Sequence, residues 1–371
     1  MSSYTATGDD GADMEDVEHA EEITREIGQE YDELIELRRR FHADPELGFN
    51  EFRTAERVAE YLRGCGIAVQ TGLAKTGVVG LIQGEAPGKT VMLRSDMDAL
   101  PITEETGLPF ASQNDGVMHA CGHDGHMAML LVAAKVLNRH RDRVPGTVKL
   151  VFQPNEEDAG AEPMVEAGVL TEPDVDAAFG IHLWSPLPTG TIGLADGPIM
   201  ASSYYFTLEI RGEGGHGGAP HLGTDTIATA TNIMQNVQNI QTRRFDAIYE
   251  PTVITFGSFH AGNSPIVLPD RATLGGSIRS LHHRDAEVRE MFEQVVRSEC
   301  ETAGVDYELT YKCGNKLLAN DTAMTELVGK TVESYPGGGL EIDSRIKVML
   351  GEDFAEFSLR VPSAFYFVGT A

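Results

Sequence analysis

Residues 118–126 read Met-His-Ala-Cys-Gly-His-Asp-Gly-His, and a helical pattern continues from about Gly125 to Asn138. A thiol and three imidazoles within nine residues form a dense set of potential metal ligands at the start of a helix. Short β-rich runs lie on both sides of this stretch, at 78–83, 90–94, 147–152 and 177–183. Strands that alternate with helices predict an α/β domain built on a doubly wound sheet.

Polar residues stand where these β-rich runs end. In doubly wound sheets, ligands bind beyond the carboxyl ends of the strands. The residues at these ends are Asp96, Asp98, Glu156, Glu157 and His182. We therefore expect them to share one pocket with the 118–126 stretch, in which Asp98 either orients a ligand or simply ends its strand.

A different pattern begins near residue 201. Strand-like runs at 204–211, 252–260, 271–279 and 307–312 alternate with helical patterns at 225–243 and 285–303. This βαββαβ order predicts a ferredoxin-like unit. We expect residues 201–313 to form a domain inserted into a metal-binding α/β domain made of residues 25–200 and 314–371.

The N-terminal segment has a composition of its own. Residues 1–24 contain eight acidic residues and no Lys or Arg, which predicts a disordered leader. Apolar spacing then suits one helix from Ile23 to Phe41 and another from Thr54 to Leu62.

The overall composition indicates a soluble protein of the cytoplasm. Its 371 residues include only four, widely spaced cysteines, and no apolar run approaches the ~20 residues of a membrane span. The formal net charge of −28 disfavours nucleic acid as a partner, because a phosphate backbone requires clustered positive charge. An acidic surface poor in lysine also suggests adaptation to concentrated salt, with an ordinary acidic cytosolic protein as the alternative.

Several motifs between about Leu37 and Val368 occur in an order shared with one protein family. They are Arg39–His42, Pro45–Phe49, Asp96–Pro101, His119–His126, Asn155–Glu157, Gly180–His182, Gly214–His216, Pro220–His221 and Gly351–Phe354. On these motifs the chain resembles the dinuclear metal-dependent amidohydrolases. That family includes hippurate hydrolases, indole-acetyl-amino-acid hydrolases, aminoacylases and related carboxypeptidases.

The resemblance implies that Cys121, His123, Glu157 and His182 bind two divalent metal ions, of the Mn, Zn, Ni or Co type. A thiolate can bridge two cations, while imidazole and carboxylate groups complete each coordination shell. Glu156 would then act as the general base. The implied reaction is hydrolysis of the amide bond of N-acyl or N-aroyl amino acids, or of small peptides.

The resemblance also implies roles for the inserted domain. His216 would polarise the scissile carbonyl oxygen, in relatives often across a dimer interface, and Arg279 would pair with the substrate carboxylate through its planar fork. The expected partners are therefore a small N-acyl amino acid substrate and a second copy of the chain, bound through residues 201–313.

Two departures from the family leave alternatives open. Relatives carry an asparagine where this chain has Ile266, so either Asn263 substitutes for it or one substrate contact is lost. Relatives also continue beyond the run that here ends at Gly369 into a segment whose histidine binds the second metal. A non-catalytic paralogue or a fragment that binds carboxylate ligands is thus the alternative to the enzyme, and a carboxypeptidase or deacetylase is the alternative within the enzyme class.

Overall fold

A computed structural model of the chain describes residues 14–371. Its larger sheet has eight strands in the order β1-β2-β4-β3-β5-β16-β6-β15. The strands are β1 Ala68–Leu73, β2 Gly77–Gln83, β3 Ala86–Asp96, β4 Pro145–Gln153, β5 Ala177–Trp184, β6 Thr191–Gly193, β15 Glu341–Asp343 and β16 Ser363–Gly369.

The expectation of a doubly wound sheet is met only in the centre of this sheet. Strands β4, β3, β5 and β16 are parallel to one another, and β6 is parallel to β15. The pairs β1–β2, β2–β4 and β16–β6 are antiparallel. The turn 74–76 between β1 and β2 is too short for the crossover that a parallel pair requires. The fold is therefore mixed α/β.

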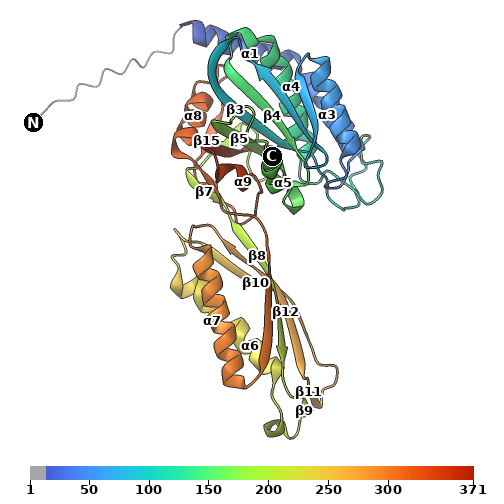
Figure 1. Cartoon of the computed structure of the whole chain (residues 1–371), viewed down its shortest axis with the longest axis vertical. Coiled ribbons are helices and arrows are strands. Elements are labelled where there is room, and N and C mark those ends of the chain that lie inside the picture. Colours follow the sequence, from blue (N-terminus) through green and yellow to red (C-terminus); the bar gives the residue numbers. More distant parts are fainter. Residues whose placement is uncertain (1–13) are drawn as a thin grey trace, which may run out of the picture.

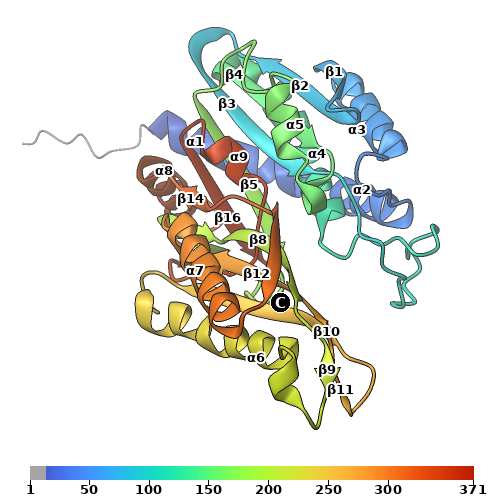
Figure 2. The same ribbon diagram turned by 60° about the horizontal axis from the view of Figure 1, so that its bottom comes forward.

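Helices cover both faces of the larger sheet (Figures 1 and 2). In β4, Val148, Leu150 and Phe152 point toward one core, whereas Val151 points toward another, as the alternation of side chains along a strand requires. The first core includes α2 Tyr31–Ala43, α3 Phe52–Gly64 and α4 His123–Arg139, and the second includes α5 Ala161–Glu166 and α9 Ala355–Ser358. Helix α8 Thr322–Glu333 packs its Val328 against β6 and β16.

The N-terminal prediction was partly wrong. Helix α1 spans Met14–Gln29, so the part of the expected disordered leader from residue 14 to residue 24 is helical; residues 1–13 lie outside the described residues. The single helix expected from Ile23 to Phe41 is two helices, because α1 ends at Gln29 and α2 begins at Tyr31. Glu26 of α1 pairs with Arg139 at the end of α4, and Glu22 pairs with Arg143 just beyond it, so this acidic segment packs against basic side chains.

The smaller sheet is antiparallel, in the order β10-β12-β8-β13. Its elements are β8 Ser202–Arg211, α6 Thr226–Asn236, β10 Thr252–Ala261, β12 Arg271–Ser280, α7 Asp285–Ala303 and β13 Asp306–Cys313. They lie within a few residues of the expected ranges, except that the helix expected at 225–243 ends at Asn236 and a short π-helical segment follows at Ile240–Arg244.

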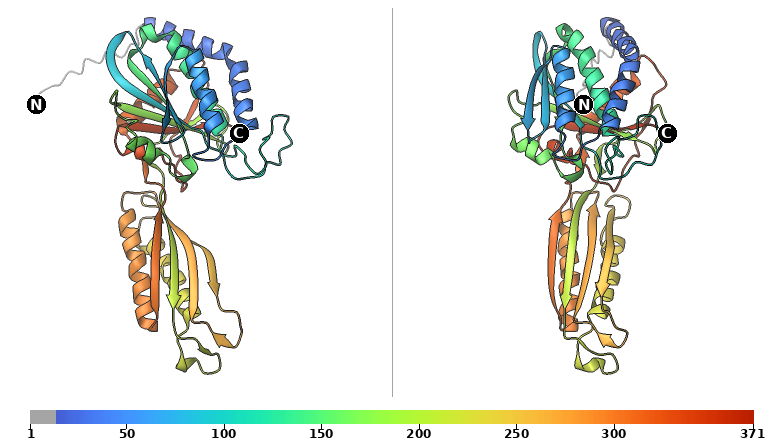
Figure 3. Two further views of the ribbon diagram at one scale, coloured as in Figure 1. Left: turned by 45° about the vertical axis from the view of Figure 1, so that its right-hand side comes forward. Right: turned by 90° about the vertical axis from the view of Figure 1, so that its right-hand side faces the viewer.

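Helices α6 and α7 cover one face of the smaller sheet (Figure 3). Phe206, Leu208 and Ile210 of β8 point into that core, while Tyr205 points to the open face. Two short strand pairs complete the fold: β7 Gly197–Met200 with β14 Leu318–Asn320, and β9 Gly215–His216 with β11 Val267–Leu268. The latter pair lies at the end of the smaller sheet that points away from the larger sheet (Figure 1).

Within residues 14–371, the structure has no helix that combines the length and the apolar character needed to cross a lipid bilayer.

Candidate metal centre

The carboxyl ends of three neighbouring strands build the candidate site. Strand β3 ends at Asp96, β4 runs into a 3-10 turn at Glu156–Asp158, and β5 carries His182 near its end. The loop before α4 adds Cys121. The next residue, Gly122, adopts a left-handed conformation with φ +90°, and this turn of the backbone brings Cys121 to the other side chains of the site. Because β4, β3 and β5 are adjacent and parallel, these side chains meet at one edge of the sheet.

The predicted metal ligands lie close together around His123. Ligand atoms of Cys121, His123 and His182 lie within 4.8 Å of one another, and so do those of His123, Glu156 and Glu157. Cys121 Sγ is 3.4 Å from His182 Nε2. The buried Nε2 atom of His123 has no hydrogen-bond partner within residues 14–371. Sulfur, imidazole and carboxylate donors around an unpartnered buried nitrogen fit divalent transition metal ions.

Hydrogen bonds orient these side chains. His123 Nδ1 donates to the carbonyl oxygen of Asp98 at 2.8 Å, so Nε2 is the ring nitrogen that would bind a metal after loss of its proton. The Asp98 carboxylate accepts the backbone N–H groups of Glu156 and Glu157 at 3.0 and 3.1 Å and so holds the turn after β4 in place. His182 Nδ1 donates to the carbonyl oxygen of Leu183 at 2.6 Å, which directs Nε2 toward Cys121.

The surroundings shift the pKa values of the site in different directions. Burial, with Glu352 and Asp353 nearby, raises the pKa of Glu156 well above its ordinary value. Burial lowers the pKa of His182 to about 4. Burial lowers the pKa of His123 too, but Asp96, Asp98 and Cys121 together outweigh this effect and hold the pKa well above its ordinary value. A carboxylate with a raised pKa binds a proton more readily, as a general base must.

Arg94 organises a network of buried carboxylates beside the site, and the sequence analysis assigned no role to this network. The fully buried guanidinium contacts Asp96 at 2.7 Å, Asp353 at 2.9 Å and Glu352 at 3.1 Å. Glu352 and Asp353 each place a carboxylate oxygen within 4.8 Å of Glu156. The sequence did contain a sign of this network, because Arg94 lies within an apolar strand. An arginine that is buried in this way must be paired with acidic side chains.

Two histidines of the 118–126 stretch differ from His123. His126 donates from Nδ1 to Asp96 at 2.7 Å, and its Nε2 accepts the backbone N–H of Leu183 at 2.9 Å, so neither nitrogen is free for a metal. His119 is buried with no hydrogen-bond partner for either ring nitrogen among the described residues, and burial lowers its pKa to about 4.

The residues predicted in the inserted domain do not join this cluster within one chain. The exposed His216 lies on β9, at the end of the smaller sheet that points away from the larger one (Figure 1). Asn263 and His216 line the same open hollow of about 800 Å³, and the side chain of Ile266 is 64% exposed nearby. Arg279 is near the other end of the smaller sheet and donates to the carbonyl oxygen of Met349 at 3.0 Å.

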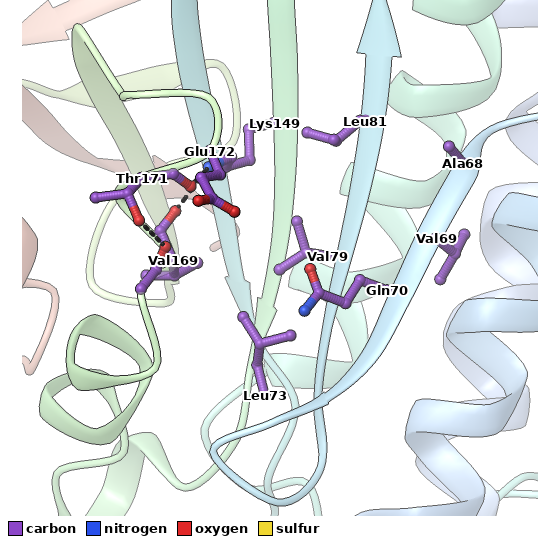
Figure 4. Close-up of a pocket in the computed structure, with 11 residues that line it drawn as sticks. Ala68, Val69, Gln70, Leu73, Val79, Leu81, Lys149, Val169, Thr171 and Glu172 are labelled. Atoms are coloured by element: carbon purple, nitrogen blue, oxygen red, sulfur yellow. Dashed lines mark hydrogen bonds between the residues drawn. The ribbon is translucent and has the colours of Figure 1, made fainter.

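A separate hollow of about 220 Å³ lies against the larger sheet (Figure 4). Leu73, Val79 and Leu81 line it together with Lys149. The Lys149 ammonium group donates to three backbone carbonyl oxygens, those of Val169, Thr171 and Pro173, at 2.8–2.9 Å. All three of its protons are used, so Lys149 anchors the 169–173 loop.

Comparison with known proteins identifies the family. A sequence model of the peptidase family M20/M25/M40 matches residues 92–371. The N-acyl-L-amino acid amidohydrolase of Geobacillus stearothermophilus is 42% identical over 303 residues, which are 81% of this chain and 81% of that protein. Thermostable carboxypeptidase 2 of Saccharolobus solfataricus is 38% identical over 356 residues, 94% of this chain and 89% of that protein.

A solved structure supports the same assignment. The YXEP protein of Bacillus subtilis, a dinuclear metal binding peptidase from the M20 family, superposes with a TM-score of 0.80 at 35% identity, covering 91% of this chain and 88% of that chain. This agreement extends over both sheets. The chain therefore belongs to the peptidase family M20/M25/M40 and is a hydrolase that acts on C–N bonds.

Proposed function

We propose that this chain hydrolyses the amide bond of N-acyl or N-aroyl amino acids, or of small peptides with a free carboxylate, at a pair of divalent metal ions. The observation that carries the proposal is the convergence of Cys121, His123, Glu157 and His182 beside the buried Glu156. Its relatives include an N-acyl-L-amino acid amidohydrolase and a carboxypeptidase, which supports both substrate classes.

The four ligand side chains would hold two metal ions, of the Mn, Zn, Ni or Co type. When bound, such a pair supplies positive charge that polarises the amide carbonyl and acidifies a water molecule. Glu156 would accept the proton of that water and deliver it to the leaving amine nitrogen. Asp98 would keep the peptide units of Glu156 and Glu157 in the orientation that this transfer needs.

We further propose that residues 201–313 form an inserted ferredoxin-like domain through which two chains pair. The strand order β10-β12-β8-β13 with two helices on one face supports this assignment. His216 lies on β9, at the end of the smaller sheet that points away from the larger one, so a second copy would supply it to polarise the scissile carbonyl oxygen. Arg279, held beside Met349, would pair with the substrate carboxylate.

The alternative of a non-catalytic paralogue that binds carboxylate ligands conflicts with the assignment of the chain as a hydrolase. The exposed Ile266 favours it, because an isoleucine offers no side-chain hydrogen bond where relatives have an asparagine. A buried Glu156 with a raised pKa favours the enzyme, because a binding module needs no general base.

The neighbouring carboxylates Glu156 and Glu157 allow a matched test. Glu156→Gln should lower kcat for N-acyl amino acids by roughly 10²–10⁴-fold, the usual contribution of a general base, and leave the metal content unchanged. Glu157→Gln should instead lower the metal content. Turnover at the unaltered rate in Glu156→Gln would refute the proposed base.

Subunit mixing tests the dimer separately. Neither Glu156→Gln nor His216→Ala should be active alone. After random pairing of equal amounts, one site of each hybrid dimer has both residues, so about a quarter of the original activity should return. No recovery in mixtures shown to contain hybrid dimers would contradict the contribution of His216 from the second chain.

A further inference from the structure

A second group of metal-ligating side chains lies between α1 and α4, away from the candidate metal centre. His19, Glu22 and Glu26 follow one another at spacings of three and four residues on α1, so they share one face of that helix. His140 follows the last residue of α4. The candidate centre uses His123, the first residue of α4, and the 17 residues of this helix correspond to about 25 Å.

We propose that His19, Glu22, Glu26 and His140 bind one divalent transition metal ion of the zinc class, which fastens α1 to α4. Ligand atoms of His19, Glu22 and His140 lie within 4.8 Å of one another, and Glu26 Oε1 is 3.3 Å from His140 Nε2. Two imidazoles and two carboxylates are an ordinary ligand set for such an ion.

The spacing of the groups agrees with a tetrahedral site. Two ligand atoms bound at about 2.0–2.1 Å to a tetrahedral ion lie about 3.3–3.4 Å apart, which matches the separation of Glu26 Oε1 and His140 Nε2. Two imidazole rings on one such ion have centroids about 5 Å apart. The centroids of His19 and His140 are 5.1 Å apart, with the rings inclined at 62°.

Two polar atoms of the cluster are buried without hydrogen bonds. His140 is only 9% exposed, and neither its Nε2 atom nor Glu26 Oε2 has a hydrogen-bond partner in the described part of the chain. An unpaired buried donor or acceptor is costly, and a cation between the two residues would satisfy both.

Two arginines already bring positive charge to the cluster. Arg143 Nη1 is 2.6 Å from His19 Nδ1 and 3.2 Å from Glu22 Oε2, and Arg139 Nη1 is 3.7 Å from Glu26 Oε2. Both side chains are about half exposed. They can withdraw into solvent, and Arg143 would have to do so when an ion binds. Removal of Arg143 should therefore strengthen metal binding, whereas removal of a ligand should weaken it.

The test uses zinc as the probe on the full chain. Zinc content after equilibrium dialysis and the zinc-dependent shift in Tm are compared for the original protein, His140→Ala, Glu26→Gln and Arg143→Gln. The exposed His283, changed to Ala, is the matched control. Glu26→Gln preserves the size of the side chain, so its result stands even if His140→Ala folds poorly.

We expect His140→Ala and Glu26→Gln to bind one zinc ion fewer per chain, or to bind it at least about tenfold more weakly, with a smaller zinc-dependent rise in Tm. His283→Ala should behave like the original, and Arg143→Gln should bind zinc more tightly. Equal zinc content and equal Tm shifts in the original, His140→Ala and Glu26→Gln would overturn the proposal. Weaker zinc binding in Arg143→Gln would also overturn it, because Arg143 would then complete the cluster itself. These readouts do not depend on hydrolysis, so they remain decisive even if the proposed function fails.

Discussion

The change of Asp98 to asparagine tests whether the candidate centre depends on a side chain that binds no metal itself. Asp98 is buried, and its two carboxylate oxygens accept the N–H groups of Glu156 and Glu157 at 3.0 and 3.1 Å. Its Oδ1 also lies 3.3 Å from His123 Nδ1. Asparagine has almost the same shape but replaces one oxygen acceptor with an NH₂ donor.

The expected effect follows from these contacts. Whichever way the amide is oriented, one backbone N–H loses its acceptor and faces another donor. A hydrogen bond to a charged group contributes about 1.5–3 kcal/mol, and an unpaired buried N–H adds about 1–3 kcal/mol, so we expect a loss of about 2–4 kcal/mol in the free energy of unfolding after partial relaxation. Residues that orient metal ligands typically change metal affinity by about 10–100-fold, and we expect a loss in that range.

The assay combines three measurements on Asp98→Asn. Metal affinity is measured by competition with a chelator, the free energy of unfolding by urea titration, and kcat with an N-acyl amino acid. The exposed Asp306, changed to Asn, is the control for loss of one negative charge. Original metal affinity and original kcat in Asp98→Asn would refute the idea that this carboxylate holds Glu156 and Glu157 in their working positions.

Three further predictions address other parts of the molecule. Lys149→Met should lower the free energy of unfolding in urea by about 2–4 kcal/mol, because three backbone carbonyl oxygens lose a charged donor; a loss below about 0.5 kcal/mol would contradict the anchoring role. Metal binding at pH 7 should release at least about two protons, since the pKa values of His123 and Cys121 are raised in the metal-free chain, whereas His182, with a pKa of about 4, is already neutral. Calorimetry in buffers of different ionisation enthalpy counts these protons, and release of none would show that His123 and Cys121 do not bind the metal. If the net charge of −28 reflects adaptation to salt, the urea midpoint should rise between low and multimolar salt; an unchanged midpoint would refute that hypothesis.

Local sequence patterns predicted much of the fold because they depend on near neighbours. Helix α7 spans Asp285–Ala303 as its apolar spacing predicted, and β4 and β5 also lie close to their predicted ranges. Ligands gather at the carboxyl ends of parallel strands, and this rule predicted that His182 and Glu157 lie near Cys121. In the structure, ligand atoms of Cys121, His182 and His123 lie within 4.8 Å of one another, and Glu157 lies equally close to His123.

The N-terminal and edge elements could not be derived in this way. The acidic helix α1 packs beside α4, where its Glu22 and Glu26 pair with Arg143 and Arg139. These arginines are more than a hundred residues away in sequence. The antiparallel pairing of β6 with β16 likewise depends on which edge of the sheet remains open when the chain returns.

The amino-acid sequence alone specifies the types of the candidate ligands, their order and the strand ends that present them, because side-chain chemistry and periodicity are properties of short stretches of chain. Long-range packing brings Arg94 to Asp353 across 259 residues and occupies both nitrogens of His126. It also places β9, which carries His216, far from the candidate metal centre of the same chain. These outcomes depend on packing between elements that are distant in sequence. The periodicity of apolar residues specifies which face of a helix or strand is buried. Which other element packs against that face depends on the assembly of the whole core.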